Sequence, residues 1–194
     1  VINVFELAIP KAEKIKNGAV YTPKYIRDYI LERVVAIQRN PLQGCLAIDI
    51  ACGCGAFLFS LADYLHSHCE LSYREAVQHL YGLDVSELSV KRCKILLSLA
   101  ALQNNETLTD EDFHISQGNS LEFDFATMPG VAENGGFDIV VGNPPYVRAK
   151  NIDDESKALL SRWQVARCGN ADLYLPFFEI ACSILREDGV LGYI

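Results

Sequence analysis

The chain has 194 residues, about the length of one domain, and its 50% hydrophobic and 22% charged residues exclude an intrinsically disordered protein. No run of about 20 apolar residues is present, so no membrane span is expected. The formal net charge of −8 argues, taken alone, against a nucleic-acid partner, because proteins that bind phosphates are normally basic.

The acidic charge is concentrated in one part of the chain. Residues 1–44 carry a net charge of +3, residues 45–138 carry −10, and residues 139–194 carry −1. We expect the acidic block to be mainly the solvated surface of helices and loops, and it cannot itself bind a polyanion. The charge argument against nucleic acid therefore applies to residues 45–138.

The cysteine pattern predicts neither a metal site nor a disulfide framework. No CxxC pair occurs and the four histidines do not cluster, so no metal is expected. No basic-then-apolar leader follows Val1, and we expect a cytoplasmic protein with reduced, mostly buried thiols. The seven cysteines are Cys45, Cys52, Cys54, Cys69, Cys93, Cys168 and Cys182.

The first predicted element is a helix that begins at Thr22 and Pro23, with Thr22 as its cap. Apolar residues at helical spacing are expected to form its buried face, namely Ile26, Tyr29, Ile30, Val34 and Ile37. Helical spacing then recurs after residue 55, with Phe57, Leu58, Leu61 and Leu65 on one side, and over residues 87–102 and 172–186. Strands are predicted over residues 45–50, 80–85, 114–117, 137–142 and 190–194, and the apolar runs over 45–50 and 137–142 are typical of buried strands.

This order of elements predicts an α/β fold with a Rossmann-like, doubly wound and mostly parallel sheet. Ligands of such sheets bind at the carboxyl ends of the strands, beside the point where the strand order reverses. The unusual residues described below all lie at predicted strand ends, so we expect one site. Residues 147–167, with five basic and three acidic side chains, could be either a mobile loop near the substrate or an ordinary amphipathic helix.

The first candidate motif is a glycine turn between a strand and a helix. Asp49 ends the strand, and Gly53 and Gly55 would let the backbone approach a ligand whose anionic group meets the helix N-terminus. The dinucleotide form GxGxxG is absent, which disfavours a pyrophosphate cofactor. Asp84 ends the next strand, 35 residues after Asp49, where an acid commonly binds ribose hydroxyls. The alternative is that Asp84 caps a helix together with Ser86.

The second motif is more specific. The apolar strand over residues 137–142 runs directly into Asn143, Pro144, Pro145 and Tyr146. The prolines fix the backbone and leave their carbonyls free, so the Asn143 side-chain oxygen and the Pro144 carbonyl can converge on one NH₂ group. Two such acceptors would draw the nitrogen towards tetrahedral geometry and free its lone pair, and Tyr146 offers a face for stacking. A purely structural proline-rich turn is the alternative.

These motifs resemble those of amino-methylating methyltransferases that use S-adenosylmethionine (SAM), and more narrowly those of bacterial adenine-N6 DNA methyltransferases of restriction–modification systems. The resemblance covers about residues 18–194. The segments that carry it are Gly18–Pro23, Asp49–Leu58, Asn143–Tyr146, Asn170–Tyr174 and Gly189–Ile194. The sequence departs from the family pattern at Ile50, Cys54 and Asn119, where the family often has Pro, Ser and Asp.

The resemblance implies SAM as the cofactor and a role for each matching residue. Asp84 would bind the ribose, Val85 would lie against the adenine of SAM and Asn119 would lie at its edge. Asn143, Pro144, Pro145 and Tyr146 would form the catalytic tip that receives a flipped-out adenine. The residues assigned to the cofactor are Tyr21, Thr22, Pro23, Asp49, Ala51, Cys52, Gly53, Gly55, Asp84, Val85, Asn119 and Ser120.

Two alternatives remain open from the sequence. Protein glutamine-N5 methyltransferases also use Asn-Pro-Pro-Tyr, because a side-chain amide presents the same NH₂ group, and an acidic surface would suit them. A degenerate SAM-fold module that only binds a partner is the non-enzymatic alternative, against which the intact Asn143–Tyr146 segment counts.

The resemblance also predicts the organisation of the chain. Residues 1–44 would be an N-terminal helical segment that carries the first cofactor motif, and residues 45–194 would be the SAM-binding catalytic domain. The family's sheet has two strands beyond the fifth, and a separate target-recognition domain normally follows. We therefore expect a C-terminally incomplete sheet, with DNA bound through a domain outside this chain. The sequence indicates no oligomeric state.

Overall fold

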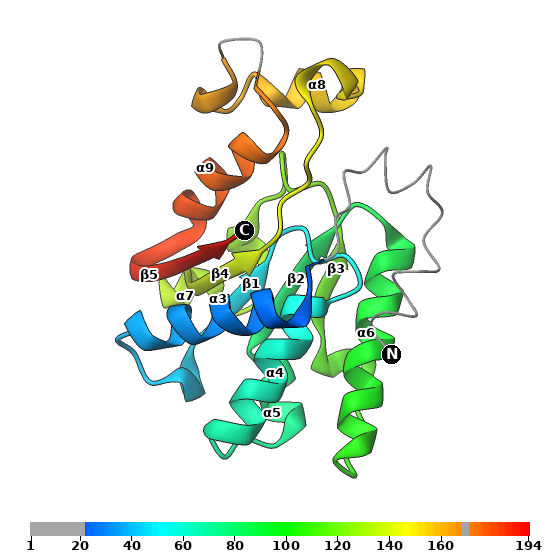
Figure 1. The fold of residues 1–194 in the computed structure, drawn as a ribbon, viewed down its shortest axis with the longest axis vertical. Helices are drawn as coiled ribbons and strands as arrows, with labels where there is room; N and C mark the ends of the chain where they lie inside the picture. Colours follow the sequence, from blue (N-terminus) through cyan, green and yellow to red (C-terminus); the bar gives the residue numbers. More distant parts are fainter. Residues whose placement is uncertain (1–21, 168–170) are drawn as a thin grey trace.

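The chain folds around a parallel sheet with helices on both faces (Figure 1). The structure, a computed structural model, describes residues 22–167 and 171–194. In these residues the strand order is β3-β2-β1-β4-β5, and every neighbouring pair is parallel. The strands are β1 (Ala47–Asp49), β2 (Leu80–Asp84), β3 (His114–Gln117), β4 (Phe137–Gly142) and β5 (Leu185–Tyr193). The predicted α/β fold is confirmed, with a sheet that is parallel at each described pairing.

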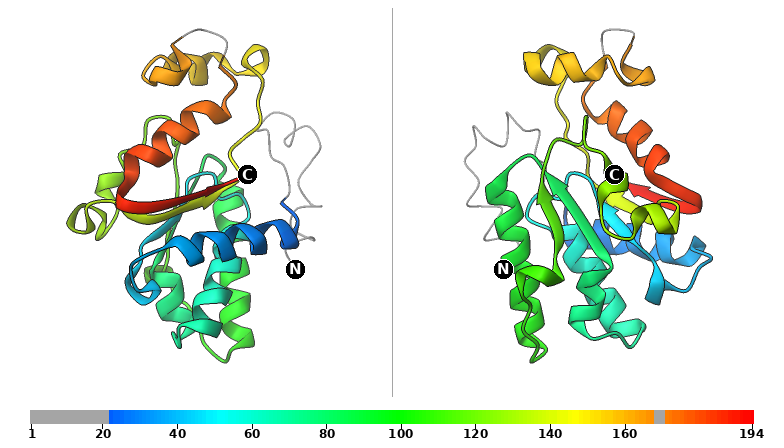
Figure 2. Two further views of the ribbon diagram at one scale, coloured as in Figure 1. Left: turned by 60° about the vertical axis from the view of Figure 1, so that its left-hand side comes forward. Right: turned by 180° about the vertical axis from the view of Figure 1, so that it is seen from behind.

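Helices cover the two faces of the sheet in separate groups, as both views of Figure 2 show. One face is packed by α3 (Lys24–Ile37), α4 (Ala56–His68), α5 (Tyr73–Gln78) and α6 (Glu87–Gln103). The other is packed by α7 (Val131–Asn134), α8 (Asp154–Leu160) and α9 (Tyr174–Ile184). Five 3₁₀ turns complete the described elements, namely η1 (Leu42–Gly44), η2 (Asp110–Asp112), η3 (Phe125–Thr127), η4 (Ala149–Asn151) and η5 (Gln164–Ala166).

Alternate residues of the central strands serve the two faces. Ile48 of β1 and Val140 of β4 pack with α7 to α9, whereas Ala47 and Ile139 pack with α3 to α6. This alternation follows from the two-residue period of a strand, and it explains why both strands are mainly apolar, with Asp49 and Asp138 as buried exceptions. The core is thus divided into two layers by the sheet.

The N-terminal helix differs from its prediction. Pro23 is the capping position of α3 and no side chain caps it, so the predicted Thr22 cap is wrong. The buried face consists of Arg27, Leu31 and Val34, whereas Tyr29 and Ile37 are exposed. The observed buried face of α3 differs from the predicted one because it includes Arg27. Hydrogen bonds from its guanidinium allow this charged side chain to lie in the core.

Two later segments also differ from the sequence pattern. The fifth strand begins at Leu185, five residues before the predicted start, and α9 ends at Ile184. Residues 147–167, for which a loop and a helix were both open, contain α8 between η4 and η5. Ile152 and Leu159 are buried there, and the Trp163 indole Nε1 donates to the Leu121 carbonyl at 3.1 Å. This segment is therefore a packed helical element beside the carboxyl ends of the strands (top of Figure 1).

The strand order reverses between β1 and β4. From β1 the chain proceeds outward to β2 and β3, then returns to the other side of β1 to form β4 and β5. Crevices at such a reversal are where open α/β sheets bind ligands. The predicted site residues Asp49, Asp84 and Asn143 stand at the carboxyl ends of β1, β2 and β4, on the two sides of this reversal.

Candidate functional site

The glycine turn after β1 forms a tight loop that leads into α4. The Gly55 N–H donates to the Cys52 carbonyl at 2.8 Å, and the Cys52 N–H donates to the Leu83 carbonyl of β2 at 3.0 Å. Gly53 and Gly55 have φ values of +52° and +82°, which glycine adopts without strain. The loop is therefore shaped by its own hydrogen bonds and by the neighbouring strand.

The two glycines of this turn have different roles. A Cβ atom at Gly53 would meet nothing within 4 Å, so this position faces open space that a ligand can approach. A Cβ atom at Gly55 would lie 2.3 Å from the Cys93 Sγ on α6. Gly55 thus serves close packing between the loop and α6.

Asp84 connects the end of β2 to the glycine turn. Its Oδ2 accepts from the Gly53 N–H at 2.8 Å, and its Oδ1 accepts from the Ser86 N–H at 2.9 Å. Burial raises the pKa of this carboxyl, and the two hydrogen bonds oppose the rise. Ser86 itself caps α6, accepting from the Ser89 N–H at 3.3 Å. A carboxylate has about four lone-pair directions, so ribose hydroxyls could still bind to Asp84.

Asp49 lies buried between the glycine turn and the end of β4. Its Oδ1 accepts from the Ala51 N–H at 3.0 Å. Burial, with a smaller contribution from the charge of Asp84, raises the pKa of Asp49 to about 7. A Cβ atom at Gly142 would lie 2.7 Å from the Asp49 Oδ1, so glycine at position 142 is what allows β4 to pass this carboxylate.

The Asn143–Tyr146 segment forms the tip of β4. The Asn143 Nδ2 donates to the Thr22 hydroxyl at 3.0 Å, which joins the N-terminal motif to the tip. The Pro145 carbonyl accepts from the Val147 N–H at 3.2 Å, so the prediction that both proline carbonyls are free is wrong for Pro145. The Pro145 carbonyl is not one of the two predicted acceptors, which are the Asn143 side-chain oxygen and the Pro144 carbonyl.

Tyr146 belongs to a row of aromatic rings. Its side chain is 47% exposed, and its hydroxyl donates to the Ile194 carbonyl at 2.6 Å. The ring lies 5.8 Å from that of Tyr174, and the row continues through Phe178 to Tyr193. The half-exposed ring of Tyr146 is thus accessible to a planar group, while its hydroxyl is held by the hydrogen bond to Ile194.

The predicted cofactor residues that follow β2 and β3 divide into an exposed and a structural group. Val85 is 52% exposed, as a residue that lies against a ligand would be. The Asn119 Oδ1 accepts from the Leu121 N–H at 3.1 Å, so it already closes a turn. Ser120 is buried and its hydroxyl donates to the Ile50 carbonyl, which ties this loop to the end of β1.

The structure brings most of the predicted site residues into one hydrogen-bonded region, and it adds others. Tyr21 lies outside the described residues. Arg27 and Asp172 were not predicted. The Asp172 Oδ1 accepts from the Ala149 N–H at 2.9 Å and so anchors the segment that follows the tip. Arg27 could have been found from the sequence, because it is an arginine within an apolar helical stripe. Asp172 could have been found because it belongs to the Asp172–Tyr174 segment.

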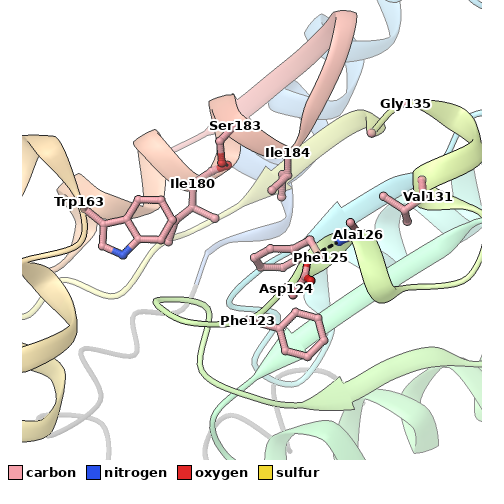
Figure 3. A pocket seen from close by; sticks show the side chains of 12 residues that line it. Phe123, Asp124, Phe125, Ala126, Val131, Gly135, Trp163, Ile180, Ser183 and Ile184 are labelled. Carbon is pink, nitrogen blue, oxygen red and sulfur yellow. Dashed lines mark hydrogen bonds between the residues drawn. The ribbon is translucent and has the colours of Figure 1, made fainter.

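A separate apolar cavity of about 370 Å³ lies between η3, α7 and α9 (Figure 3). Phe123 and Phe125 line it on one side, and Ile180 and Ile184 line it on the other. None of the predicted catalytic or cofactor residues lines this cavity. It is distinct from the carboxylates and the glycine turn described above.

The described cysteines are free thiols, and Cys52 and Cys93 are buried side by side. A hydrogen bond with Cys93, together with burial, raises the pKa of the Cys52 thiol well above its usual value. Cys52 therefore stays protonated and is unsuited to act as a nucleophile. Cys168 lies outside the described residues. Within the described part of the chain, no three metal-ligating side chains gather, and no helix is long and apolar enough to cross a membrane.

The donor set at the carboxyl ends of the strands fits a ligand of the SAM type. Open space at Gly53 would admit a ligand beside the backbone, and the Asp84 carboxylate stands next to it for hydroxyl groups. The Asp49 carboxyl, once ionised, would suit an ammonium group. These features fit the amino acid and the ribose of SAM, and the Asn143–Tyr146 tip lies across the strand reversal from them.

The family model of the Eco57I restriction-modification methylases matches residues 78–194, which is more than half of the chain. The chain belongs to this family. The match includes Asp84 at the end of β2 and the whole Asn143–Tyr146 tip. It begins after the glycine turn, which lies outside the matched residues.

Curated relatives extend the methylase resemblance over nearly the whole chain. The type II restriction enzyme and methyltransferase RM.Eco57I of Escherichia coli is 27% identical and covers 95% of this chain, which spans 24% of that protein. The type II methyltransferase M.BstVI of Geobacillus stearothermophilus is 30% identical over 92% of this chain, which spans 33% of it. The adenine-specific methyltransferase PglX of Streptomyces coelicolor is 25% identical over 96% of this chain, which spans 20% of it. The chain therefore spans a third or less of these relatives.

Solved structures show the same fold. A DrdV–DNA complex matches 97% of this chain with a TM-score of 0.71 at 21% identity, and this chain spans 21% of it. A class I SAM-dependent methyltransferase from Listeria monocytogenes, itself described as putative, matches 99% of this chain with a TM-score of 0.64 at 18% identity, and this chain spans 49% of it. At these identities the likeness concerns the fold alone, which this chain shares with both structures.

Proposed function

We propose that this chain is the SAM-binding catalytic part of a DNA methyltransferase of a restriction–modification system, and that its acceptor is the exocyclic N6 amine of adenine. The observation that carries the proposal is the placement of Asn143 and Pro144 at the end of β4, across the strand reversal from the Asp49 turn. Membership of the Eco57I methylase family supports the reaction class, and the adenine-specific relative PglX supports adenine.

The chemistry proposed for the tip follows from hydrogen bonding. The Asn143 Oδ1 and the Pro144 carbonyl accept the two hydrogens of the target amine, which draws electron density back onto its nitrogen. Tyr146 stacks on the base and holds it in line with the methyl donor. Proximity and orientation then supply much of the rate. When bound, SAM supplies an activated methyl group on a sulfonium, and the reaction calls for neither a metal nor a covalent enzyme intermediate.

The cofactor residues are proposed from their positions at the strand ends. Gly53 gives the backbone approach, Asp84 binds the ribose and Val85 lies against the adenine of SAM. Asp49 and Thr22 lie towards the methionine part. The remaining proposed contacts, which act mainly through the backbone or through neighbouring residues, are Tyr21, Pro23, Ala51, Cys52, Gly55, Asn119 and Ser120.

The proposed partner is DNA that is recognised mainly outside this chain. The block of net charge −10 over residues 45–138 carries the cofactor side of the site and is unsuited to phosphate contacts. A duplex adenine must leave the base stack to reach Asn143. We propose that residues 1–44 contribute the first cofactor motif, that residues 45–194 form the catalytic domain, and that the reaction takes place in the cytoplasm.

The experiment that tests the function is transfer of a labelled methyl group by the native protein. Duplex DNA and a protein substrate with a methylatable glutamine are offered in parallel, and DNA products are digested to nucleosides for mass spectrometry. We expect N6-methyladenine, and a loss of about 100-fold or more in Asn143→Ala, by analogy with the removal of other polarising groups.

Two results would contradict the proposal. Methylation of the glutamine and not of DNA would assign the chain to the protein-modifying class. Calorimetry without binding of either SAM or its demethylated product would instead indicate a degenerate module. Asn143→Ala is the matched control in each assay, because it removes the side-chain amide of the tip and leaves the glycine turn intact.

A further inference from the structure

The contact between Thr22 and Asn143 joins two segments that are 121 residues apart in the chain. The Asn143 Nδ2 donates to the Thr22 hydroxyl oxygen at 3.0 Å. Thr22 is only 5% exposed, so water does not compete freely for this hydroxyl. The hydrogen bond therefore fixes one end of the Asn143 amide within the site.

The two ends of an asparagine amide are chemically opposite. The NH₂ group is a double donor and the oxygen is an acceptor, and a half-turn of the side chain exchanges them. The proposed reaction requires Oδ1 to face the target amine, because an NH₂ group placed there would repel another donor. With Nδ2 held by Thr22, Oδ1 occupies the other end of the amide.

We propose that Thr22 is a positioning residue for methyl transfer, whose hydroxyl holds the Asn143 amide in the orientation that presents Oδ1 to the target amine. This inference rests on the proposed function, because the required orientation is set by an amine acceptor. It assigns Thr22 a task that acts through Asn143, in addition to any contact with the cofactor.

A buried arginine places Thr22 for this task. Arg27 is 2% exposed, and its guanidinium donates to the Thr22 carbonyl and, through Nε, to the Ser60 hydroxyl on α4 at 3.2 Å. The backbone of Thr22 is thereby tied to both α3 and α4. This explains why α3 buries a charged side chain at a core position, where an apolar residue would ordinarily stand.

The hydroxyl of Thr22 has a further property that bears on the orientation. A threonine hydroxyl can accept and donate at once, and here its oxygen accepts from Asn143. Its hydrogen can therefore be given to an anionic group such as the carboxylate of methionine. A hydroxyl that donates its hydrogen bond to an anion can only accept from Asn143. An anion at this point would therefore reinforce the same orientation of the amide.

The test compares Thr22→Val, which keeps the shape and removes the hydroxyl, with Thr22→Ser, which keeps the hydroxyl. Thr127→Val is the matched control, since Thr127 is exposed on η3. Methyl transfer by the native protein is measured at saturating SAM. We expect kcat to fall about 10- to 100-fold in Thr22→Val, to recover in Thr22→Ser within about threefold, and to be unchanged in the control.

A second measurement does not depend on activity. Hydrogen exchange of the Asn143 side-chain NH₂ is followed by NMR in the protein without cofactor, with Thr22→Ala as a further variant. We expect slow exchange in the wild type and in Thr22→Ser, and exchange at least about tenfold faster in Thr22→Val and Thr22→Ala. Binding of SAM should slow the exchange further in the wild type.

The outcomes separate this inference from the proposed function. An unchanged kcat at saturating SAM in Thr22→Val, with only the affinity for SAM reduced, would make Thr22 a cofactor ligand alone and overturn the inference. Equal NH₂ exchange in wild type and Thr22→Val would overturn it as well, whatever the activity. Absence of DNA methylation by the wild type, with Asn143 exchange as expected, would contradict the proposed function and leave the Thr22–Asn143 contact established.

Discussion

The Asp84 carboxylate at the end of β2 accepts a hydrogen bond from the backbone N–H of Gly53, in the turn that follows β1, at 2.8 Å. Its other oxygen accepts from the Ser86 N–H at 2.9 Å. One side chain thus determines the shape of a loop that lies 31 residues earlier in the chain. The loop that we propose for the cofactor is held in place before any cofactor binds.

Replacement of Asp84 by asparagine should therefore weaken both the fold and cofactor binding. The amide introduced by Asp84→Asn could accept from only one of the two N–H groups and would turn its NH₂ towards the other. We expect the affinity for SAM to fall at least about tenfold and the free energy of unfolding to fall by about 1–3 kcal/mol. Calorimetry and denaturant unfolding measure these quantities.

The matched control for Asp84 is Glu111→Gln, which removes an exposed acid on η2. It should change neither quantity. An Asp84→Asn variant with normal SAM affinity would show that the glycine turn does not need this anchor and that the ribose contact is not made by Asp84.

Alanine at the two glycines of the turn should separate packing from ligand approach. Gly55→Ala would bring a methyl group within 2.3 Å of the Cys93 Sγ, at a φ of +82°, and we expect a loss of about 2–4 kcal/mol in the free energy of unfolding. Gly53→Ala meets open space at a φ of +52°, so its cost should be about 1 kcal/mol. Denaturant unfolding measures both.

The affinity for SAM is the second quantity in which the two glycine variants are compared. Gly53→Ala should lower the affinity for SAM more than its small effect on stability implies, because its methyl group fills the approach to the backbone. The double variant Gly55→Ala/Cys93→Ala should regain part of the stability lost in Gly55→Ala alone. A lack of any such recovery would contradict the packing role of Gly55.

The buried Asp49 predicts an unusual dependence of stability on pH. Burial raises its pKa to about 7 in the folded protein, whereas an aspartate in an unfolded chain has a pKa of about 4. The folded state therefore binds more protons between these values, so this group makes the protein less stable as the pH rises from about 4 to 7. Asp49→Asn should be similar to the wild type near pH 4 and more stable by a few kcal/mol at pH 8.

Denaturant unfolding of the wild type and Asp49→Asn at pH 4, 6 and 8 measures this effect. A stability difference that is constant with pH would mean that Asp49 does not titrate in this range. The same variant should bind SAM less tightly at pH 8, because the proposed ammonium contact needs the carboxylate. A gain in stability together with a loss of affinity is the expected signature of a residue kept for binding.

Tyr146 allows its ring and its hydroxyl to be tested separately. Tyr146→Phe removes only the hydrogen bond to the Ile194 carbonyl, and we expect methyl transfer within about threefold of the wild type. Tyr146→Ala removes the stacking surface, and we expect a loss of about 10- to 100-fold, corresponding to about 1–3 kcal/mol for one stacked base. SAM affinity should be unchanged in both. A larger effect of Tyr146→Phe than of Tyr146→Ala would contradict the stacking role.

Short strands that are bounded by glycine or polar residues were predictable from sequence. The predictions over residues 114–117 and 137–142 match β3 and β4 residue by residue. The start of β5 was missed because Arg186 and Asp188 interrupt its apolar pattern. These residues occur where β5 pairs irregularly with β4, at a register shift between Phe137 and Ile139, so the local sequence does not show a strand.

The candidate site was predictable in its strand-end residues and unpredictable in its long-range hydrogen bonds. Asp49, Asp84 and Asn143 follow apolar runs, and the parallel order alone places them at one edge of the sheet. The bond from Asn143 to Thr22 joins residues whose proximity depends on how α3 packs. That packing depends on the buried Arg27, which lies in the apolar stripe of α3 although a charged side chain is ordinarily exposed.

The passage of Gly142 beside Asp49 has a consequence for how the sequence can evolve. A methyl group at position 142 would lie 2.7 Å from the Asp49 Oδ1, so neither position can vary without regard to the other. A lineage that acquires a side chain at position 142 must first shorten the residue at position 49, at the expense of the carboxylate there. We expect substitutions at the two positions to be correlated among descendants of a common ancestor, with glycine at 142 retained wherever the acid at 49 is retained.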